Sequence, residues 1–257
     1  MSRSISFDPA AEYYDRTRAL PPDIQARVTS LLARELSGRG PCLEVGIGTG
    51  RMALPLRGAG AEMIGIDLSL EMLLRLREKA GAQAIPAARA DATQLPFPDH
   101  TFGAALACHV LHLIPDWRRA AAEMVRVTRP GGVVLIDRGG GPQAWRELTR
   151  RFFQAAGDPR WPVGLNRHQD LDAVMAALGT AVRTLDPIES QDRGRVGPRI
   201  DSLEQGIFAA CWDLEPEALR RAAAETRRWA VERYGSLEAE VEVTHSIVWR
   251  AYDLPSP

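Results

Sequence analysis

LEVGIGTG, residues 43–50, is the stretch that decides the fold. A short apolar run, typical of a strand, leads there into three glycines at every second position, with a carboxylate two residues before the first glycine. Because glycine lacks a Cβ, such a loop can turn tightly and bring its backbone against a ligand. Ligands commonly bind across the ends of parallel strands. The stretch therefore predicts a cofactor site at the end of a strand in an α/β sheet.

The glycine spacing distinguishes this loop from two kinds of loop that bind phosphate groups. A dinucleotide fingerprint reads G-x-G-x-x-G, and its third glycine allows close helix packing. Here the spacing is G-x-G-x-G, and Arg51 stands in the place of that third glycine. A P-loop requires Gly-Lys-Ser/Thr, whereas the only lysine of the chain is Lys79. The spacing argues against a nicotinamide or nucleoside triphosphate site, and it leaves a plain strand-to-helix turn as the alternative.

Strand-like and helix-like segments alternate after the loop. Met63–Asp67 is a short apolar run that ends in a carboxylate, where a βαβ unit can hold both hydroxyls of a ribose. A second apolar run covers Gly103–Cys108, and a third, Val133–Ile136, follows the turn Arg129–Gly132. This alternation predicts a parallel sheet with helices on both faces.

Five segments, in this order and spacing over about residues 40–137, resemble the class I S-adenosylmethionine-dependent methyltransferases. They are LEVGIGTGR, GIDLSLEML, ARADATQLPFPDHTF, ALACHVLHLIPDW and RVTRPGGVVLI. The chain looks most like the small-molecule branch that includes ubiquinone/menaquinone-biosynthesis-type enzymes. The resemblance implies a Rossmann-like, doubly wound α/β fold whose seven-stranded sheet is mostly parallel with an antiparallel last strand. It also implies methyl transfer by in-line displacement from S-adenosyl-L-methionine to a small-molecule acceptor, with S-adenosyl-L-homocysteine as product.

The resemblance predicts a single methyltransferase domain over residues 1–257. Its parts are an N-terminal helical segment over the cofactor (1–40), a cofactor-binding half (41–140) and a substrate-side half (141–257). In the last part we expect helices near 142–156, 167–178, 202–212 and 216–233, and strands near 181–188 and 240–252. The last two strands of the family form a hairpin, so the residues between them here look inserted. We expect a helical lid at about 190–238.

The glycine loop receives its roles from the same resemblance. Gly46, Gly48 and Gly50, with Ile47, would bring the backbone close to the methionine part of the cofactor. Glu44 stands at the position that meets the cofactor amino group, directly or through water. The alternative for Glu44 is a carboxylate that only holds the loop in place.

The next two motifs would bind the nucleoside. Asp67 would hold the ribose diol, and Leu68 and Met72 would pack against the adenine. Asp91 matches the position that accepts a hydrogen bond from the adenine amino group, with the Ala92 backbone nearby. The alternative for Asp91 is a helix or turn cap.

Candidates for the reacting centre come from two segments. In the N-terminal EYYDRTR run, the resemblance makes Tyr14 the candidate for contact with the cofactor carboxylate or sulfonium, and Arg18 the candidate for contact with the carboxylate. The alternative for this run is an amphipathic docking helix. Cys108 ends the apolar run Gly103–Cys108 and is expected to be a small packing residue beside the cofactor. His109 and His112 are the candidate bases, with packing as their alternative; they share a face if that segment is helical.

Composition narrows the remaining classes. A net charge of −1 gives no overall attraction to nucleic acid or acidic membranes. A nucleic-acid amino-methyltransferase would carry an Asn/Asp-Pro-Pro-aromatic run where this chain has ACHV. The three cysteines lack CxxC spacing, so we expect no metal site. Because the chain also shows no apolar core of a signal peptide, we expect a cytoplasmic protein. We expect it to act as a monomer or homodimer. A non-catalytic S-adenosylmethionine-binding or regulatory protein is the alternative function.

Overall fold

The computed structural model describes residues 4–137, 139, 141–157 and 162–256, which divide into two compact units. The first unit comprises Met1–Gly139, Val163–Ile188 and Ile247–Pro257, and the second comprises Gly140–Pro162 and Glu189–Ser246. Within the described residues, no helix is both long and apolar enough to span a membrane.

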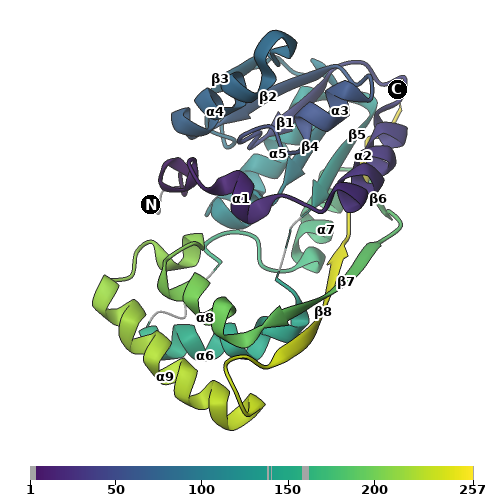
Figure 1. Cartoon of the computed structure of the whole chain (residues 1–257). Coiled ribbons are helices and arrows are strands. Elements are labelled where there is room, and N and C mark those ends of the chain that lie inside the picture. The colour runs from purple at the N-terminus through teal and green to yellow at the C-terminus, as the bar shows by residue number, and fades with distance from the viewer. Residues whose placement is uncertain (1–3, 138, 140, 158–161, 257) are drawn as a thin grey trace. The chain divides into compact units, whose positions relative to one another are not determined.

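The first unit is built on a seven-stranded sheet (Figure 1) with the order β3-β2-β1-β4-β5-β9-β6. The strands are β1 Cys42–Val45, β2 Met63–Asp67, β3 Ala87–Arg89, β4 Phe102–Cys108, β5 Thr128–Asp137, β6 Ala181–Thr184 and β9 Arg250–Asp253. β1 to β5 pair in parallel, and β9 lies antiparallel between β5 and β6. The predicted fold class is confirmed.

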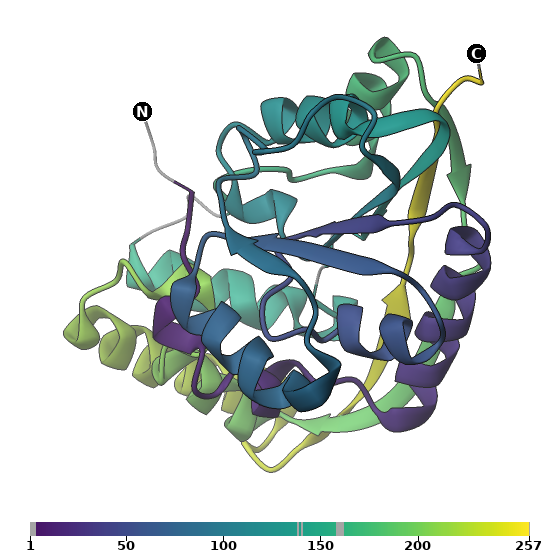
Figure 2. The ribbon, with the colours of Figure 1, turned by 90° about the horizontal axis from the view of Figure 1, so that it is seen from above.

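Helices cover both faces of this sheet (Figure 2). They are α1 Tyr14–Arg18, α2 Pro22–Leu36, α3 Ala53–Gly58, α4 Leu70–Ala80, α5 Trp117–Val127 and α7 His168–Ala177, with 3₁₀ turns at Asp8–Ala10, Gly81–Gln83 and Leu111–Leu113. Strand side chains alternate between the faces. Cys42 packs with α2 and α3, whereas Leu43 and Val45 pack with α5 and α7. The central strands β1 and β4 are therefore buried on both sides, whereas β3 and β6 are exposed.

The second unit has a core of its own. It contains α6 Arg146–Ala156, α8 Val196–Glu204, α9 Pro216–Tyr234, 3₁₀ turns at Gln143–Trp145 and Ala209–Cys211, and a two-stranded sheet of β7 Ile188–Arg195 and β8 Glu240–Ile247. Most of it is inserted between β6 and β9, the last two strands of the large sheet. Whether this segment closes over a substrate stays a prediction.

Three predicted elements in this half are wrong in their bounds. The helix expected near 202–212 is α8, which runs from Val196 to Glu204. The strand expected near 181–188 ends at Thr184, because Pro187 cannot donate a hydrogen bond to a ladder, and β7 begins after it. The closing strand expected near 240–252 is two strands, since β8 pairs with β7 and β9 with β5. The inserted segment is thus part helix and part sheet, not purely helical.

Candidate active site

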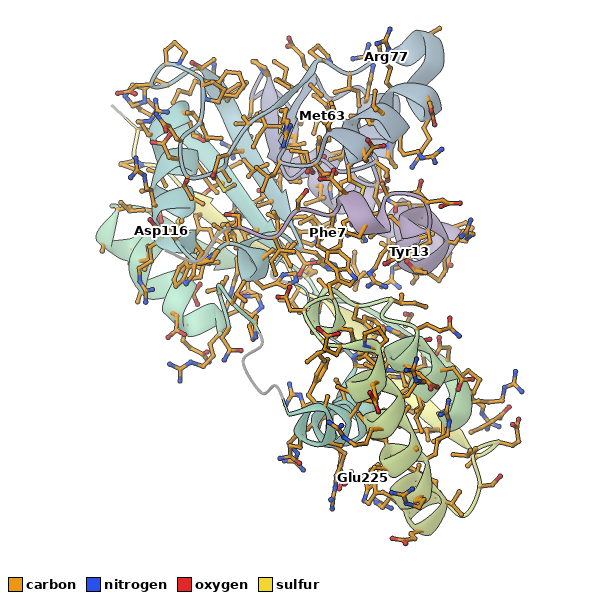
Figure 3. All side chains as sticks on the ribbon, turned by 90° about the vertical axis from the view of Figure 1, so that its left-hand side faces the viewer. Phe7, Tyr13, Met63, Arg77, Asp116 and Glu225 are labelled. Atoms are coloured by element: carbon orange, nitrogen blue, oxygen red, sulfur yellow. The ribbon has the colours of Figure 1, made fainter. Side chains whose placement is uncertain are left out.

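A cleft in the first unit encloses about 660 Å³, including its solvent-open mouth. It lies where β1, β2 and β4 end, as expected for ligand sites of parallel sheets. The predicted site residues on its wall are Tyr14, Gly46, Gly48, Asp67, Leu68, Met72, Asp91, Ala92, Cys108 and His109. The same wall contains residues that the sequence did not single out, among them Ile5, Phe7, Val110, Leu113 and Ile114. Phe7 is labelled on the N-terminal segment in Figure 3.

The backbone conformation of the glycine loop would be strained with any other residue type. Gly46, Gly48 and Gly50 have φ values of 73°, 55° and 83°, in the left-handed region that favours glycine. The Gly46 and Ile47 amides donate to the Ile66 carbonyl at 2.8 and 3.0 Å, which ties the loop to β2. A Cβ on Gly46 would lie 2.7 Å from Val110, whereas a Cβ on Gly48 would meet no atom within 4 Å. Gly48 thus leaves open space at the cleft.

Asp67 joins the ends of β1 and β2. Its Oδ2 accepts from the Gly48 amide at 2.8 Å, and its Oδ1 accepts from the Ser69 amide at 2.8 Å. Burial raises the pKa of Asp67, while hydrogen bonds from the backbone amides of Ser69, Gly48 and Leu68 lower it. A carboxylate has about four acceptor positions. Because Asp67 also lines the cleft, its remaining acceptor capacity is available for a ligand.

Leu68 and Met72 give this part of the cleft an apolar wall, and Met72 is fully buried. Asp91, on the same wall, is exposed, and its Oδ1 accepts from both the amide and the hydroxyl of Thr93 at 2.8 Å. Oδ1 of Asp91 therefore caps the turn, as the alternative interpretation predicted. Its contact with an adenine amino group stays a prediction.

Glu44 and Arg51 form a polar pair beneath the loop. Glu44 is 2% exposed, and its Oε2 has no hydrogen-bond partner among the described residues. Burial, opposed by Arg51 and reinforced by Asp67, raises the pKa of Glu44 to about 8. Although burial disfavours its charge, Arg51 has a raised pKa because Cys108, Tyr14, Asp137 and Glu44 surround it. Arg51 is therefore charged, and Glu44 is mostly protonated at neutral pH.

Arg51 also organises the reacting end of the cleft. Its Nη2 donates to the Cys108 sulfur at 3.2 Å, and it donates a hydrogen bond to the Tyr14 hydroxyl oxygen. Burial raises the pKa of Cys108, so the thiol stays protonated. In the sequence, Arg51 was notable only as a residue that replaces a glycine. No sequence signal gave it a role in the site.

His109 and Asp137 form a hydrogen-bonded dyad. Nε2 of His109 lies 2.9 Å from Oδ2 of Asp137, and the His109 amide donates to the Asp137 carbonyl at 2.9 Å. Oδ1 of Asp137 accepts from the Gly139 amide at 2.8 Å. Although burial opposes it, His109, the Gly139 amide and Arg51 together lower the pKa of Asp137. Sequence reasoning missed Asp137, although it ends β5 in register with Cys108 at the end of β4.

The N-terminal segment is fastened across this edge of the sheet. The Ile5 amide donates to the Leu113 carbonyl at 3.1 Å, and the Ser69 hydroxyl donates to Oδ1 of Asp8. Asp15 accepts from the Thr49 hydroxyl at 2.7 Å and from Lys79 at 2.8 Å. These contacts join the segment to the glycine loop and to α4.

Tyr14 holds the same segment at the cleft. Its ring meets Phe7 edge to face at 6.0 Å between centroids, and burial raises the pKa of its hydroxyl. Both rings lie on the cleft wall. The predicted position of Tyr14 beside a ligand fits this geometry.

Five predicted site residues are not on the cleft wall. Ile47 is buried, with its side chain against Gly65, and Gly50 lies against Leu54 and Leu76. Both support the loop from behind. The other three are Glu44, Arg18 and His112. The condition under which His109 and His112 would share a helical face is not met, because His112 lies in a 3₁₀ turn, Leu111–Leu113, that begins after His109.

The strand order, with β9 antiparallel, and the glycine loop at the end of β1 define the class I methyltransferase fold. Residues 43–136 match the family described as "Methyltransferase domain". The chain therefore carries a class I S-adenosylmethionine-dependent methyltransferase domain, and the predicted family is confirmed.

Two curated relatives match part of the chain. The phosphatidylethanolamine N-methyltransferase of Cereibacter sphaeroides is 44% identical over 101 residues, which are 38% of this chain and 49% of that protein. The demethylmenaquinone methyltransferase of Streptomyces avermitilis is 38% identical over 133 residues, 51% of this chain and 57% of that protein. The chain thus spans about half the length of the curated relatives it matches.

Solved structures share the fold over almost the whole chain. YcgJ from Bacillus subtilis has a TM-score of 0.63 at 17% identity and covers 90% of this chain and 99% of its own. The [4+2]-cyclase SpnF has a TM-score of 0.56 at 22% identity and covers 99% of each chain. At these identities the likeness concerns the fold alone.

Proposed function

We propose that this chain is an S-adenosylmethionine-dependent methyltransferase that transfers a methyl group by in-line displacement to a small-molecule acceptor. The observation that carries the proposal is the meeting of Gly48, Asp67, Asp91 and His109 on the wall of one cleft. A nucleoside site and a possible acid–base residue thus share a single cavity.

The residues present fit the cofactor at three points. Gly48 leaves open the space that a side chain would fill, so a ligand can approach the backbone. Glu44 has a buried carboxyl oxygen without a partner among the described residues, as expected if a cofactor amino group, directly or through water, completes the site. Asp67 would accept the ribose hydroxyls with its remaining acceptor capacity.

The bound cofactor would supply a sulfonium-activated methyl group. The chain then has to align the acceptor with it and exclude water, and alignment alone contributes ~7–11 kcal/mol in well-oriented reactions. The Tyr14 ring is one means of positioning the charge, because an aromatic face attracts a cation by ~0.5–2 kcal/mol. Tyr14 and Phe7 would hold the reacting end under the N-terminal segment.

The relatives guide the choice of acceptors to test. Their names specify phosphatidylethanolamine and demethylmenaquinone as what those proteins methylate. The family match ends at residue 136, before the second half of the chain. We therefore extend only the small-molecule class to this protein, with a cytoplasmic monomer or homodimer as part of the proposal.

Calorimetry and methyl transfer together test the proposal. The purified protein is titrated with S-adenosylmethionine, S-adenosylhomocysteine and NADH, and we expect micromolar binding of the first two alone. Tritiated donor is then offered with phosphatidylethanolamine in micelles, phosphoethanolamine or a reduced demethylmenaquinone, with Asp67→Ala as the inactive control. Binding of NADH alone would refute the cofactor assignment. Tight donor binding with no transfer to any acceptor would favour the non-catalytic alternative.

A further inference from the structure

We propose that His109 is the general base of this site, that Asp137 fixes its imidazole with the Nδ1 lone pair free, and that the acceptor is a protic one. Such an acceptor is a phenol, an enol or an ammonium group, which must lose an O–H or N–H proton to be methylated. The proposal rests on the methyltransferase function proposed above and extends it to a residue pair and an acceptor class.

The geometry of the dyad selects one tautomer. Both oxygens of Asp137 are engaged, Oδ1 by the Gly139 amide and Oδ2 by Nε2 of His109. A carboxylate can only accept, so Nε2 carries the hydrogen and donates it. In a neutral imidazole the other nitrogen, Nδ1, then has a free lone pair. Nδ1 is the atom that takes a proton.

The backbone holds the ring in this orientation. His109 has φ = 56°, an unusual value for a residue with a side chain. Its amide is bonded to the carbonyl of Asp137, so the pair is joined by main chain and side chain. On the other side, a Cβ on Gly139 would lie 2.7 Å from the imidazole, so only glycine allows the backbone to approach the ring this closely. Backbone strain maintained at a cleft residue is a feature of functional sites.

Exposure places the free nitrogen in reach of a substrate. Asp137 is almost fully buried, whereas the His109 side chain is 35% exposed and lies on the cleft wall. Within the described part of the chain, the His109 ring makes one hydrogen bond, to Asp137. One side of the imidazole is thus fixed by protein, and the side chain is accessible from the cavity that holds the proposed nucleoside site.

The charges around the dyad suit a proton acceptor. The titratable groups that act on Asp137 besides His109 are Arg51 and Cys108, and Arg51 in turn interacts with Tyr14 and Glu44. Asp137 remains ionised, because its pKa is lowered, and Arg51 balances that charge. When His109 takes up a proton, the imidazolium lies against the Asp137 carboxylate, the arrangement that stabilises a catalytic base after proton transfer.

A metal site is the other chemistry that these side chains suggest. The ligating atoms of Cys108, His109 and Asp137 all lie within 4.8 Å of one another. However, Arg51 donates to the Cys108 sulfur, and its charge would repel a cation there. Burial also raises the pKa of the Cys108 thiol, whereas a metal ligand must be a thiolate. The surroundings therefore favour acid–base chemistry.

The reaction balances without a further reagent. The acceptor gives its proton to Nδ1 of His109 and its electron pair to the methyl carbon. The carbon–sulfur bond breaks with its electrons on sulfur, which leaves a neutral thioether. His109 then releases the proton to solvent.

Nuclear magnetic resonance tests the tautomer without any acceptor. Two-bond ¹H–¹⁵N correlations of ¹⁵N-labelled protein distinguish protonated from free imidazole nitrogens, and the His109→Asn variant assigns the His109 signals. Asparagine tolerates a positive φ, so this variant should fold. We expect protonated Nε2 and free Nδ1 in the wild type, with that preference lost in Asp137→Asn. Protonated Nδ1 in the wild type would overturn the proposal, as would micromolar zinc binding that shifts the His109 signals.

Kinetics on the fastest acceptor of the panel then test the role. His109→Asn should lower kcat by ~10²–10⁴-fold, the usual contribution of a general base, with donor affinity within twofold of the wild type. His109→Gly, which suits the backbone, should recover part of the rate with added imidazole. Asp137→Asn should lower kcat with little change in KM and shift the acid limb of the pH profile. His245→Gln, in the second unit, is the control.

These experiments distinguish failure of the base assignment from failure of the proposed methyltransferase function. If the wild type binds the donor and methylates an acceptor while the dyad variants keep its rate and pH profile, the base assignment fails and the methyltransferase function stands. If the wild type binds no donor, the proposed function fails, and the tautomer measurement still decides whether the dyad has the geometry of a base.

Discussion

The Gly48 amide donates a hydrogen bond of 2.8 Å to Oδ2 of Asp67, nineteen residues along the chain. This bond joins the loop after β1 to the end of β2, so two separate sequence motifs form one rim of the cleft. The second oxygen of Asp67 accepts from Ser69, which begins α4. Asp67 therefore shapes the site as well as offering lone pairs to a ligand.

Replacement of Asp67 separates these two contributions. Asp67→Ala loses both backbone bonds and the ligand contact, and hydrogen bonds to a charged group contribute ~1.5–3 kcal/mol each. We expect donor affinity to fall by ~100-fold or more. Asp67→Asn keeps the shape and one accepting oxygen, so its loss should be smaller. Calorimetry measures both, with circular dichroism to verify folding; equal affinity of Asp67→Ala and the wild type would contradict the ribose assignment.

Two glycines of the loop should respond differently to one added methyl group. Gly46→Ala places a Cβ 2.7 Å from Val110 and adds the strain of a positive φ, ~1–2 kcal/mol, so it should lower the melting temperature by several degrees. Gly48→Ala has similar strain but no protein atom within 4 Å. It should lose mainly donor affinity, because the methyl group takes up space at the cleft. Thermal denaturation and calorimetry distinguish the two, and identical profiles would refute this explanation of the spacing.

Ser69 has two partners that can be removed one at a time. Its hydroxyl oxygen caps α4 by accepting from the Met72 amide at 3.1 Å, and its hydrogen goes to Asp8. Ser69→Ala should cost ~0.5–2 kcal/mol of stability through the lost cap. Asp8→Ala leaves the cap intact and should release only the N-terminal segment. We expect faster donor dissociation in both variants, measured by stopped flow, but a lower unfolding midpoint mainly in Ser69→Ala.

The sequence predicted the features that local spacing determines. The glycine loop, Asp67 and the alternation of strands and helices follow from short motifs, and the sheet agrees with them. Asp137 was missed because it is a single carboxylate after an apolar run, and its value comes from the register that sets it beside Cys108. Phe7 was missed because its place depends on hydrogen bonds of Ile5 and Asp8 to distant residues. The position of His112 relative to His109 could not be predicted, because three-residue spacing does not fix the helix type that follows a strand.

Glu44 gives a pH dependence whose direction is fixed by its burial. Its folded pKa, about 8, lies well above its ordinary value of 4.5. Between these two values the folded state holds a proton that the unfolded state has released. Stability therefore falls as pH rises through this window, by about 1.4 kcal/mol per unit at its steepest. Above about pH 8 both states are ionised, and Glu44 adds no further slope.

Glu44→Gln isolates this effect, because an amide has the shape of the protonated acid and no charge to lose. The contribution of Asp137 is present in both proteins and cancels in the comparison, whereas Asp67 is coupled to Glu44 and its change is part of the measured effect. Urea unfolding at pH 5, 6, 7 and 8 should show the variant gaining stability relative to the wild type at each step, by a few kcal/mol in total. Parallel curves would mean that Glu44 is ionised throughout, with Arg51 outweighing its burial. The buried oxygen of Glu44 would then be a charged acceptor before any ligand arrives.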